Sequence, residues 1–163
     1  MRMNFSLLAA LDERVNLCEH RGVNLSERYS PGRCFVAMSF DRSLDEAYEK
    51  GIRVALKDDC NLDPIRIDKV HHNEKICEKL IAEIRLSQFL VADVTWHRAN
   101  VYFEAGFALG LGRPVIWTCR EDEFTKEKVQ FDTRQYPHIV WTTPLELREK
   151  LRDHFNATFL VKS

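Results

Sequence analysis

The sequence predicts an α/β fold: a flavodoxin-like, Rossmann-like three-layer sandwich built on a five-stranded parallel sheet, with an extra helix at the N-terminus. Short apolar segments of strand length alternate with amphipathic segments of helical length, a pattern typical of βαβ units. The strand-like segments are apolar almost throughout, as expected of a sheet that is covered on both faces. Right-handed crossovers between such strands most simply give the order 2-1-3-4-5.

The elements of the α/β part follow from local residue patterns. We expect strands at 34–40, 64–68, 88–94, 113–119 and 138–141. Apolar residues spaced three and four apart predict helices at 44–57, from Asn73 or Glu74 onward, at 99–111 and at 144–155. Asp41 suits a turn and a helix cap. We expect Gly106 where a helix packs closely on a strand, and Gly112 as the C-cap of that helix.

The N-terminal part differs from the rest in its pattern. Residues 3–22 have helical spacing, and a polar stretch, NLSERYSPGR, follows as a linker. The apolar stripe of this expected helix consists of Phe5, Leu8, Leu11, Val15 and Cys18. The chain therefore divides into an N-terminal helix and linker, 1–32, and one α/β domain, 33–163.

Composition narrows the class of protein. A net charge of −1, from 24 basic and 25 acidic residues, argues against a non-specific nucleic-acid binder. The five cysteines are scattered without a CxxC pair, as expected of free thiols in a reducing compartment. No apolar run approaches the ~20 residues that a membrane span needs. We expect a cytoplasmic protein.

One acid stands out in the segment NVYFEAGFALGLGRPV. Glu104 is the only carboxylate in a stretch that is otherwise built for burial. An ionised and unpaired carboxylate in a core would cost several kcal/mol, so Glu104 either has a partner or lies on the wall of a site. A partner would be Arg98 or Arg120. Asn100 lies four residues earlier and therefore on the same helix face.

Asp93 ends the third expected strand and is expected on the same rim as Glu104. Two nearby carboxylates push their pKa values apart, so that one stays ionised as a nucleophile while the other is hydrogen-bonded. The plainer interpretation is that Asp93 caps the following turn through the backbone N–H of Thr95 or Trp96. These two roles are compatible.

Other polar and aromatic residues follow the carboxyl ends of strands, where open α/β sheets bind their ligands. His71 and His72 are adjacent and lack a third ligand at suitable spacing, so we expect a solvated or substrate-facing loop and no metal. Cys119 is expected as a buried thiol. No glycine-rich phosphate loop follows the first strand, and this absence from the sequence disfavours dinucleotide dehydrogenases and NTPases. The candidate substrate-binding residues are Ser39, Phe40, Asp68, His71, His72, Trp96, Arg98, Asn100 and Arg120.

The segments FVAMSF, RID and LVADVT…NVYFEAGFALGLGRPVI resemble the nucleoside 2-deoxyribosyltransferase-like superfamily, which has TIR-like domains as structural relatives. The resemblance covers residues 33–143. It implies that Glu104, the glutamate of the motif, attacks C1′ of a nucleoside and forms a covalent glycosyl intermediate. It also implies that Asp93, on the preceding strand, orients the sugar hydroxyls or the base.

We therefore expect an enzyme that cleaves the N-glycosidic bond of a nucleoside, nucleotide or related N-riboside without a cofactor. Water as acceptor would give hydrolysis, and a base would give transfer. Deoxyribosyltransferases complete each site with residues of a neighbouring subunit, so the resemblance implies a homo-oligomer, and the N-terminal helix is free to pack on a partner or protomer. The alternatives are a TIR-like NAD glycohydrolase, a non-catalytic nucleotide-sensing module, or an effector partnered with another protein.

Overall fold

A computed structural model describes residues 29–67, 74–124, 133 and 135–160. The helix expected at 3–22 lies outside the described residues, and so do Asp68, His71 and His72. The division into 1–32 and 33–163 remains a prediction. The first strand begins at Ser30, within the segment that was assigned to the linker.

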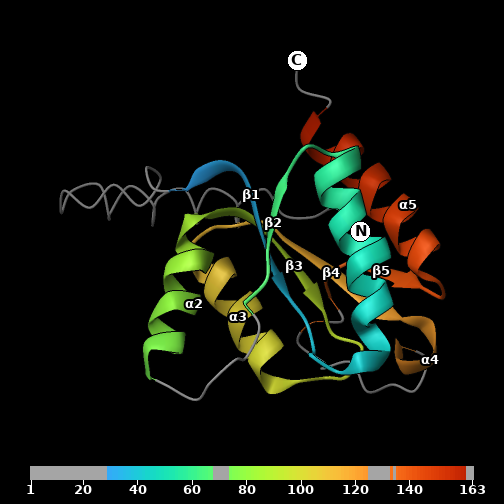
Figure 1. Ribbon diagram of the computed structural model, residues 1–163. Coiled ribbons are helices and arrows are strands. Elements are labelled where there is room, and N and C mark those ends of the chain that lie inside the picture. Colours follow the sequence, from blue (N-terminus) through green and yellow to red (C-terminus); the bar gives the residue numbers. More distant parts are fainter. Residues whose placement is uncertain (1–28, 68–73, 125–132, 134, 161–163) are drawn as a thin grey trace.

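The five strands are all parallel and form one sheet in the order β2-β1-β3-β4-β5, which confirms the predicted fold class. Their bounds are β1 Ser30–Ala37, β2 Asp63–Ile65, β3 Ser87–Asp93, β4 Val115–Arg120 and β5 His138–Trp141. Helices cover both faces (Figure 1). They are η1 Arg42–Leu44, η2 Ala47–Ile52, η3 Ala55–Asp59, α2 Glu74–Leu86, α3 Ala99–Gly110, α4 Glu121–Phe124, α5 Pro144–Phe155 and η5 Asn156–Leu160.

Two elements match their predicted bounds, β5 and α5. Others differ: β1 ends at Ala37 rather than 40, and β2 ends at Ile65 rather than 68. The expected helix 44–57 is a 3₁₀ turn followed by two π-helical segments. Its apolar residues still face inward, because apolar spacing identifies the buried face of a helix but not the hydrogen-bond period of its backbone.

The glycines have different roles from one another. Gly112 has φ +71° and donates its N–H to the Leu109 carbonyl at 2.9 Å, which confirms it as the residue that ends α3. The close packing predicted at Gly106 is wrong, because a Cβ there would meet nothing within 4 Å. Close approach occurs instead at Gly51, where a Cβ would lie 3.0 Å from the Pro144 carbonyl oxygen. Gly51 therefore lets η2 approach α5.

Two apolar clusters fill the space between the sheet and its helices. Side chains alternate along each parallel strand, so neighbouring residues contribute to opposite clusters. One cluster joins Val36, Val91 and Trp141 to η2, η3 and α5. The other joins Phe35 and Leu90 to α2 and α3. In Figure 1, α2 and α3 lie on one side of the sheet, and α5 lies on the other.

Polar contacts fix the position of α5. Arg148 donates from Nε and Nη2 to the two Asp59 carboxylate oxygens, both at 2.7 Å, and so ties α5 to η3. At the start of the helix, Thr143 Oγ1 accepts from the Glu146 N–H at 3.2 Å, while the Glu146 carboxylate accepts from the Thr142 N–H at 2.7 Å. This arrangement is a variant of the capping box, in which the Glu146 carboxylate binds the N–H of the residue before the N-cap.

The capping box predicts a specific pH dependence of stability. Lys150 and Thr142 bind the Glu146 carboxylate and lower its pKa from 4.5 to about 2. A carboxyl whose folded pKa is depressed stabilises the fold above its unfolded pKa, and this contribution is lost as the pH falls. We expect Glu146→Gln to remove the part of the pH dependence between about pH 4.5 and 2, measured by urea unfolding. Glu149→Gln, an exposed neighbour on the same helix, is the control, and an equal effect there would contradict the assignment.

Candidate active site

Two neighbouring cavities open at the carboxyl edge of the sheet. The first, which we call the apolar cavity, has a volume of about 350 Å³. The second, the polar cavity, has a volume of about 380 Å³. Phe40 and Asn100 line both of them. The apolar cavity is further lined by Phe35, Val36, Met38, Ile67, Leu80, Ile81, Phe103 and Glu104, and the polar cavity by Ser39, Asp41 and Arg98.

Among the described residues, Glu104 is the only acid on the wall of the apolar cavity. Its side chain comes from the second turn of α3, and the residue is only 6% exposed. Asn100, one turn earlier, donates from Nδ2 to Glu104 Oε1 at 3.3 Å. The surrounding apolar side chains keep water scarce, and low local polarity strengthens the electrostatic effect of a carboxylate on a developing positive charge. A carboxylate in such a place is suited to attack or stabilise an electrophilic carbon.

The polar cavity carries charges of both signs. Arg98 is the N-cap residue of α3 and makes no side-chain capping bond. The first N–H groups of a helix have no partners within the helix, and together with the helix dipole they favour an anion. Asp41 accepts from the Ser43 N–H at 3.0 Å and from the Ser43 hydroxyl at 2.7 Å. These bonds lower the pKa of Asp41, with further lowering from Arg98 and Arg120, so Asp41 is ionised at neutral pH.

Phe40, the wall between the two cavities, is held by a cation. The guanidinium of Arg66 lies 4.7 Å from the centre of the Phe40 ring and 4.5 Å from that of Tyr48. Such cation–π contacts restrain the ring that they cover. Sequence reasoning missed Arg66 and Phe103, and it predicted for Asp41 only the cap that the Ser43 N–H confirms, not its place in the polar cavity. A charged residue within the short apolar run PIRID was the available signal for Arg66.

Asp93 lies at the end of β3 and is only 1% exposed. Its Oδ1 accepts from the Thr95 N–H at 3.2 Å, which confirms the predicted cap on the turn. Its Oδ2 accepts from Thr118 Oγ1 at 2.7 Å and from Trp141 Nε1 at 3.1 Å. Burial raises the pKa of Asp93, while these donors oppose the rise. One carboxylate therefore connects the ends of β3, β4 and β5.

The two predicted catalytic carboxylates face opposite sides of the sheet. Along β3 the Asp93 side chain lies on the same face of the sheet as Val91, which belongs to the cluster that packs on α5. Leu90 and Ala92 lie on the opposite face. Glu104 comes from α3, which covers the other face. Of these two acids, only Glu104 lies on the wall of the apolar cavity, and Asp93 lines neither cavity as far as the described residues show.

The remaining predicted residues fall into two groups. Ser39, Phe40, Arg98 and Asn100 come together in the polar cavity. Trp96 and Arg120 lie outside both cavities, where the Arg120 guanidinium covers the Trp96 ring at 5.0 Å and Arg120 Nε donates to Asp122 at 2.6 Å.

Three further observations concern the chemistry of the chain. Burial raises the pKa of the Cys119 thiol to about 12, so this residue is a buried thiol, as predicted. Within the described ranges, no three His, Cys, Asp or Glu side chains gather as metal ligands would. No helix in those ranges has the length and apolar character to cross a membrane.

The Asp93 contacts predict large losses of stability. Asp93→Ala would leave three buried donors without an acceptor, and we expect the free energy of unfolding to fall by on the order of 3 kcal/mol, measured by urea unfolding. Trp141→Phe removes one donor and should cost about 1 kcal/mol. Trp96→Phe is the matched control, because among the described residues the Trp96 indole N–H has no hydrogen-bond partner. Equal losses at Trp141 and Trp96 would argue against the network.

Comparison with known proteins finds a likeness in structure and none in sequence. No protein-family model matches the chain, and no curated protein matches its sequence. Among solved structures, the chain is similar to the CMP N-glycosidase BcmB of Clostridium botulinum, with a TM-score of 0.59 and 18% sequence identity. The match covers 75% of this chain and 98% of that chain. At this level of identity the likeness establishes a shared fold.

Proposed function

We propose that this protein cleaves the N-glycosidic bond of a nucleoside monophosphate, with Glu104 as the nucleophile. The observation that carries the proposal is the sparsely solvated Glu104 carboxylate on the wall of an apolar cavity that adjoins a polar cavity containing Arg98. The resemblance of the motif around Glu104 supports it, and so does the likeness in fold to a CMP N-glycosidase.

The apolar cavity suits the base and C1′ of the substrate. Glu104 would attack C1′ as the bond to the base nitrogen breaks, and the base would leave with the bonding electrons and take a proton from solvent. Water would then attack C1′ of the glycosyl ester and release the sugar and the free carboxylate. Asn100, bonded to Glu104 Oε1, would hold the nucleophile in one rotamer. Phe40, held under Arg66, would form a fixed face beside the base.

The polar cavity suits the phosphate. Arg98 supplies a cation at the start of α3, where backbone N–H groups and the helix dipole also favour an anion. Ser39, which is buried, adds a hydroxyl group to the same wall. The charge of Asp41 in this cavity is suited to accept hydrogen bonds from the sugar hydroxyls.

The predicted contact of Asp93 with the sugar or base stays a prediction. Its burial favours an indirect role, in which the carboxylate holds the turn before α3 and so sets the position of Asn100 and Glu104. Trp96 and Arg120 lie outside both cavities, and we propose no substrate contact for them. Hydrolysis and transfer differ only in the acceptor, which is water in the first and a base in the second.

The central test is the loss of turnover when Glu104 is replaced by glutamine. Incubated with cytidine, the common nucleoside monophosphates and NAD, the native protein should release free base from a monophosphate, measured by chromatography. Glu104→Gln removes the nucleophile but keeps the size of the side chain, so we expect turnover to fall by at least about 10³-fold with ligand binding retained.

The control is Glu46→Gln, which changes an exposed glutamate outside both cavities and should leave turnover unchanged. Release from NAD alone would favour the TIR-like glycohydrolase instead. Specific nucleotide binding by calorimetry without any base release would favour the sensing module. Turnover that survives in Glu104→Gln would contradict the assigned nucleophile even if the substrate is right.

The phosphate assignment has its own test. Arg98→Ala removes a charged hydrogen-bond donor, which is worth about 1.5–3 kcal/mol, so KM for the monophosphate should rise by roughly 10- to 100-fold. KM for the corresponding nucleoside should stay nearly constant. Arg53→Ala, which removes an exposed arginine paired with Glu49, is the matched control. A similar rise for nucleoside and nucleotide would place the phosphate elsewhere.

A further inference from the structure

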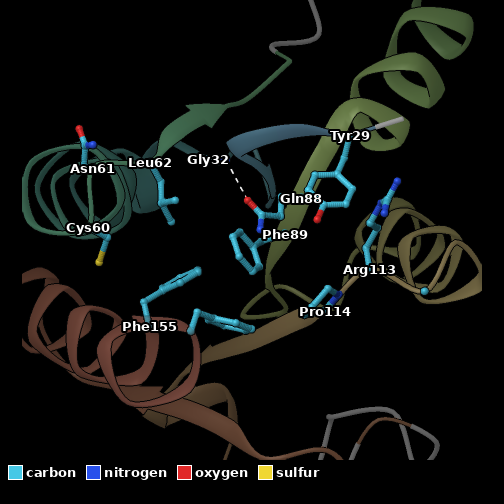
Figure 2. Close-up of a pocket in the computed structure, with 12 residues that line it drawn as sticks. Tyr29, Gly32, Cys60, Asn61, Leu62, Gln88, Phe89, Arg113, Pro114 and Phe155 are labelled. Carbon is cyan, nitrogen blue, oxygen red and sulfur yellow. Dashed lines mark hydrogen bonds between the residues drawn. The ribbon is translucent and has the colours of Figure 1, made fainter. Parts of the chain in front are cut away.

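A larger cavity lies at the opposite, amino edge of the sheet. Its volume is about 560 Å³, and Figure 2 shows its walls. Leu62 lies on one side, Tyr29 and Arg113 lie on the other, Phe89 lies between them, and Phe155 lies below Leu62 (Figure 2). Gly32, at the start of β1, donates its N–H to the side-chain oxygen of Gln88 in this wall at 2.8 Å. Neither the nucleotide site nor the Asp93 network uses this cavity.

The walls suit an apolar occupant with an acid at its border. Phe155 and Phe159 pack on Phe89, with ring centres 5.4 and 4.6 Å from that of Phe89. At the rim, the guanidinium of Arg113 lies 4.6 Å from the centre of the Tyr29 ring. Arg113 Nε is buried without a hydrogen-bond partner among the described residues. A buried donor without an acceptor is costly, and an acidic side chain at this rim would relieve that cost.

The chain itself supplies a segment of this kind. The described part begins at Tyr29, which lines the cavity. The 28 residues that precede Tyr29 are therefore attached to the domain at the rim of this cavity. Within them, residues 3–22 carry the apolar stripe that includes Phe5, Leu8 and Leu11. Asp12 and Glu19 each lie one helical turn from Val15, and at 3.6 residues per turn both fall on the face of the stripe, between Leu8 and Phe5. Both apolar and charge complementarity are therefore present.

We propose that residues 3–22 pack as an amphipathic helix into this cavity of the same chain, with the stripe facing Leu62, Phe159 and Tyr29. Residues 23–28 connect this helix to Tyr29. Fully extended, a connection of this length spans up to ~20 Å, which is enough for the chain to turn back over the rim of the cavity. Tethering on so short a connection gives an effective concentration in the millimolar range, so even weak apolar contacts would keep the segment bound.

The test is photo-crosslinking in the full chain. A photoreactive phenylalanine analogue is placed at position 8, on the stripe, or at position 10, outside it. Equal amounts of chain with natural and heavy nitrogen are mixed, so that crosslinks within one chain differ in mass from those between chains. We expect the probe at position 8 to crosslink within its own chain to residues 29–32, 60–62, 112–114 or 155–159. The probe at position 10 should crosslink to none of them.

A second measurement links contact to stability. Leu8→Asp combined with Leu11→Asp should lower Tm by about 5 °C, because two leucines lose their buried environment. Ala10→Asp adds a similar charge outside the stripe and should leave Tm nearly unchanged. Crosslinks between light and heavy chains would assign the cavity to a second copy and overturn the proposal. Crosslinks outside the cavity walls, or equal Tm shifts for both variants, would overturn it as well.

Discussion

The carboxylate of Asp93 is the interaction on which the carboxyl edge of this protein depends. Its two oxygens accept from Thr95, Thr118 and Trp141, which belong to the turn after β3, to β4 and to β5. The turn is then fixed a second time, because Thr95 Oγ1 accepts from the Arg120 N–H at 3.0 Å. Burying a charge is expensive unless hydrogen bonds compensate it, and here the compensating donors come from three strand ends. The start of α3, and with it both carboxyl-edge cavities, is placed by this arrangement.

The alternation of side chains along β3 separates the two acids that the sequence singles out. Asp93 shares the direction of Val91, toward α5, whereas Glu104 comes from α3 on the opposite face. The environment of Glu104 is therefore set by the apolar cavity and by Asn100. Two acids in separate environments can divide structural and chemical roles between them. In the proposed reaction Glu104 acts from the apolar cavity, while Asp93 holds the strand ends together.

The periodicity of the sequence predicted the fold class, the sheet order and the bounds of β5 and α5, because these depend on which residues are buried. It also predicted four residues that meet in the polar cavity, since strand ends and helix starts of a parallel sheet share one edge. It could not predict the two distant partners of Asp93, Thr118 and Trp141, which lie 25 and 48 residues away and depend on strand register. The π-helical segments and the contact of Arg66 with Phe40 depend on backbone hydrogen bonding and side-chain direction, which apolar spacing does not encode.

The pairing of β1 with β3 explains how the two edges of the sheet can serve different purposes. From Cys34 to Ala37 the register is regular, but it shifts between Ser30 and Cys34. In the shifted part Gly32 has φ +79° and bonds to the Gln88 side chain. An irregularity of this kind bends the strand locally, whereas a regular ladder keeps neighbouring strands in fixed register. The irregular part of this pairing therefore lies at the amino-edge cavity, whereas the regular ladder and the Asp93 carboxylate lie at the carboxyl edge.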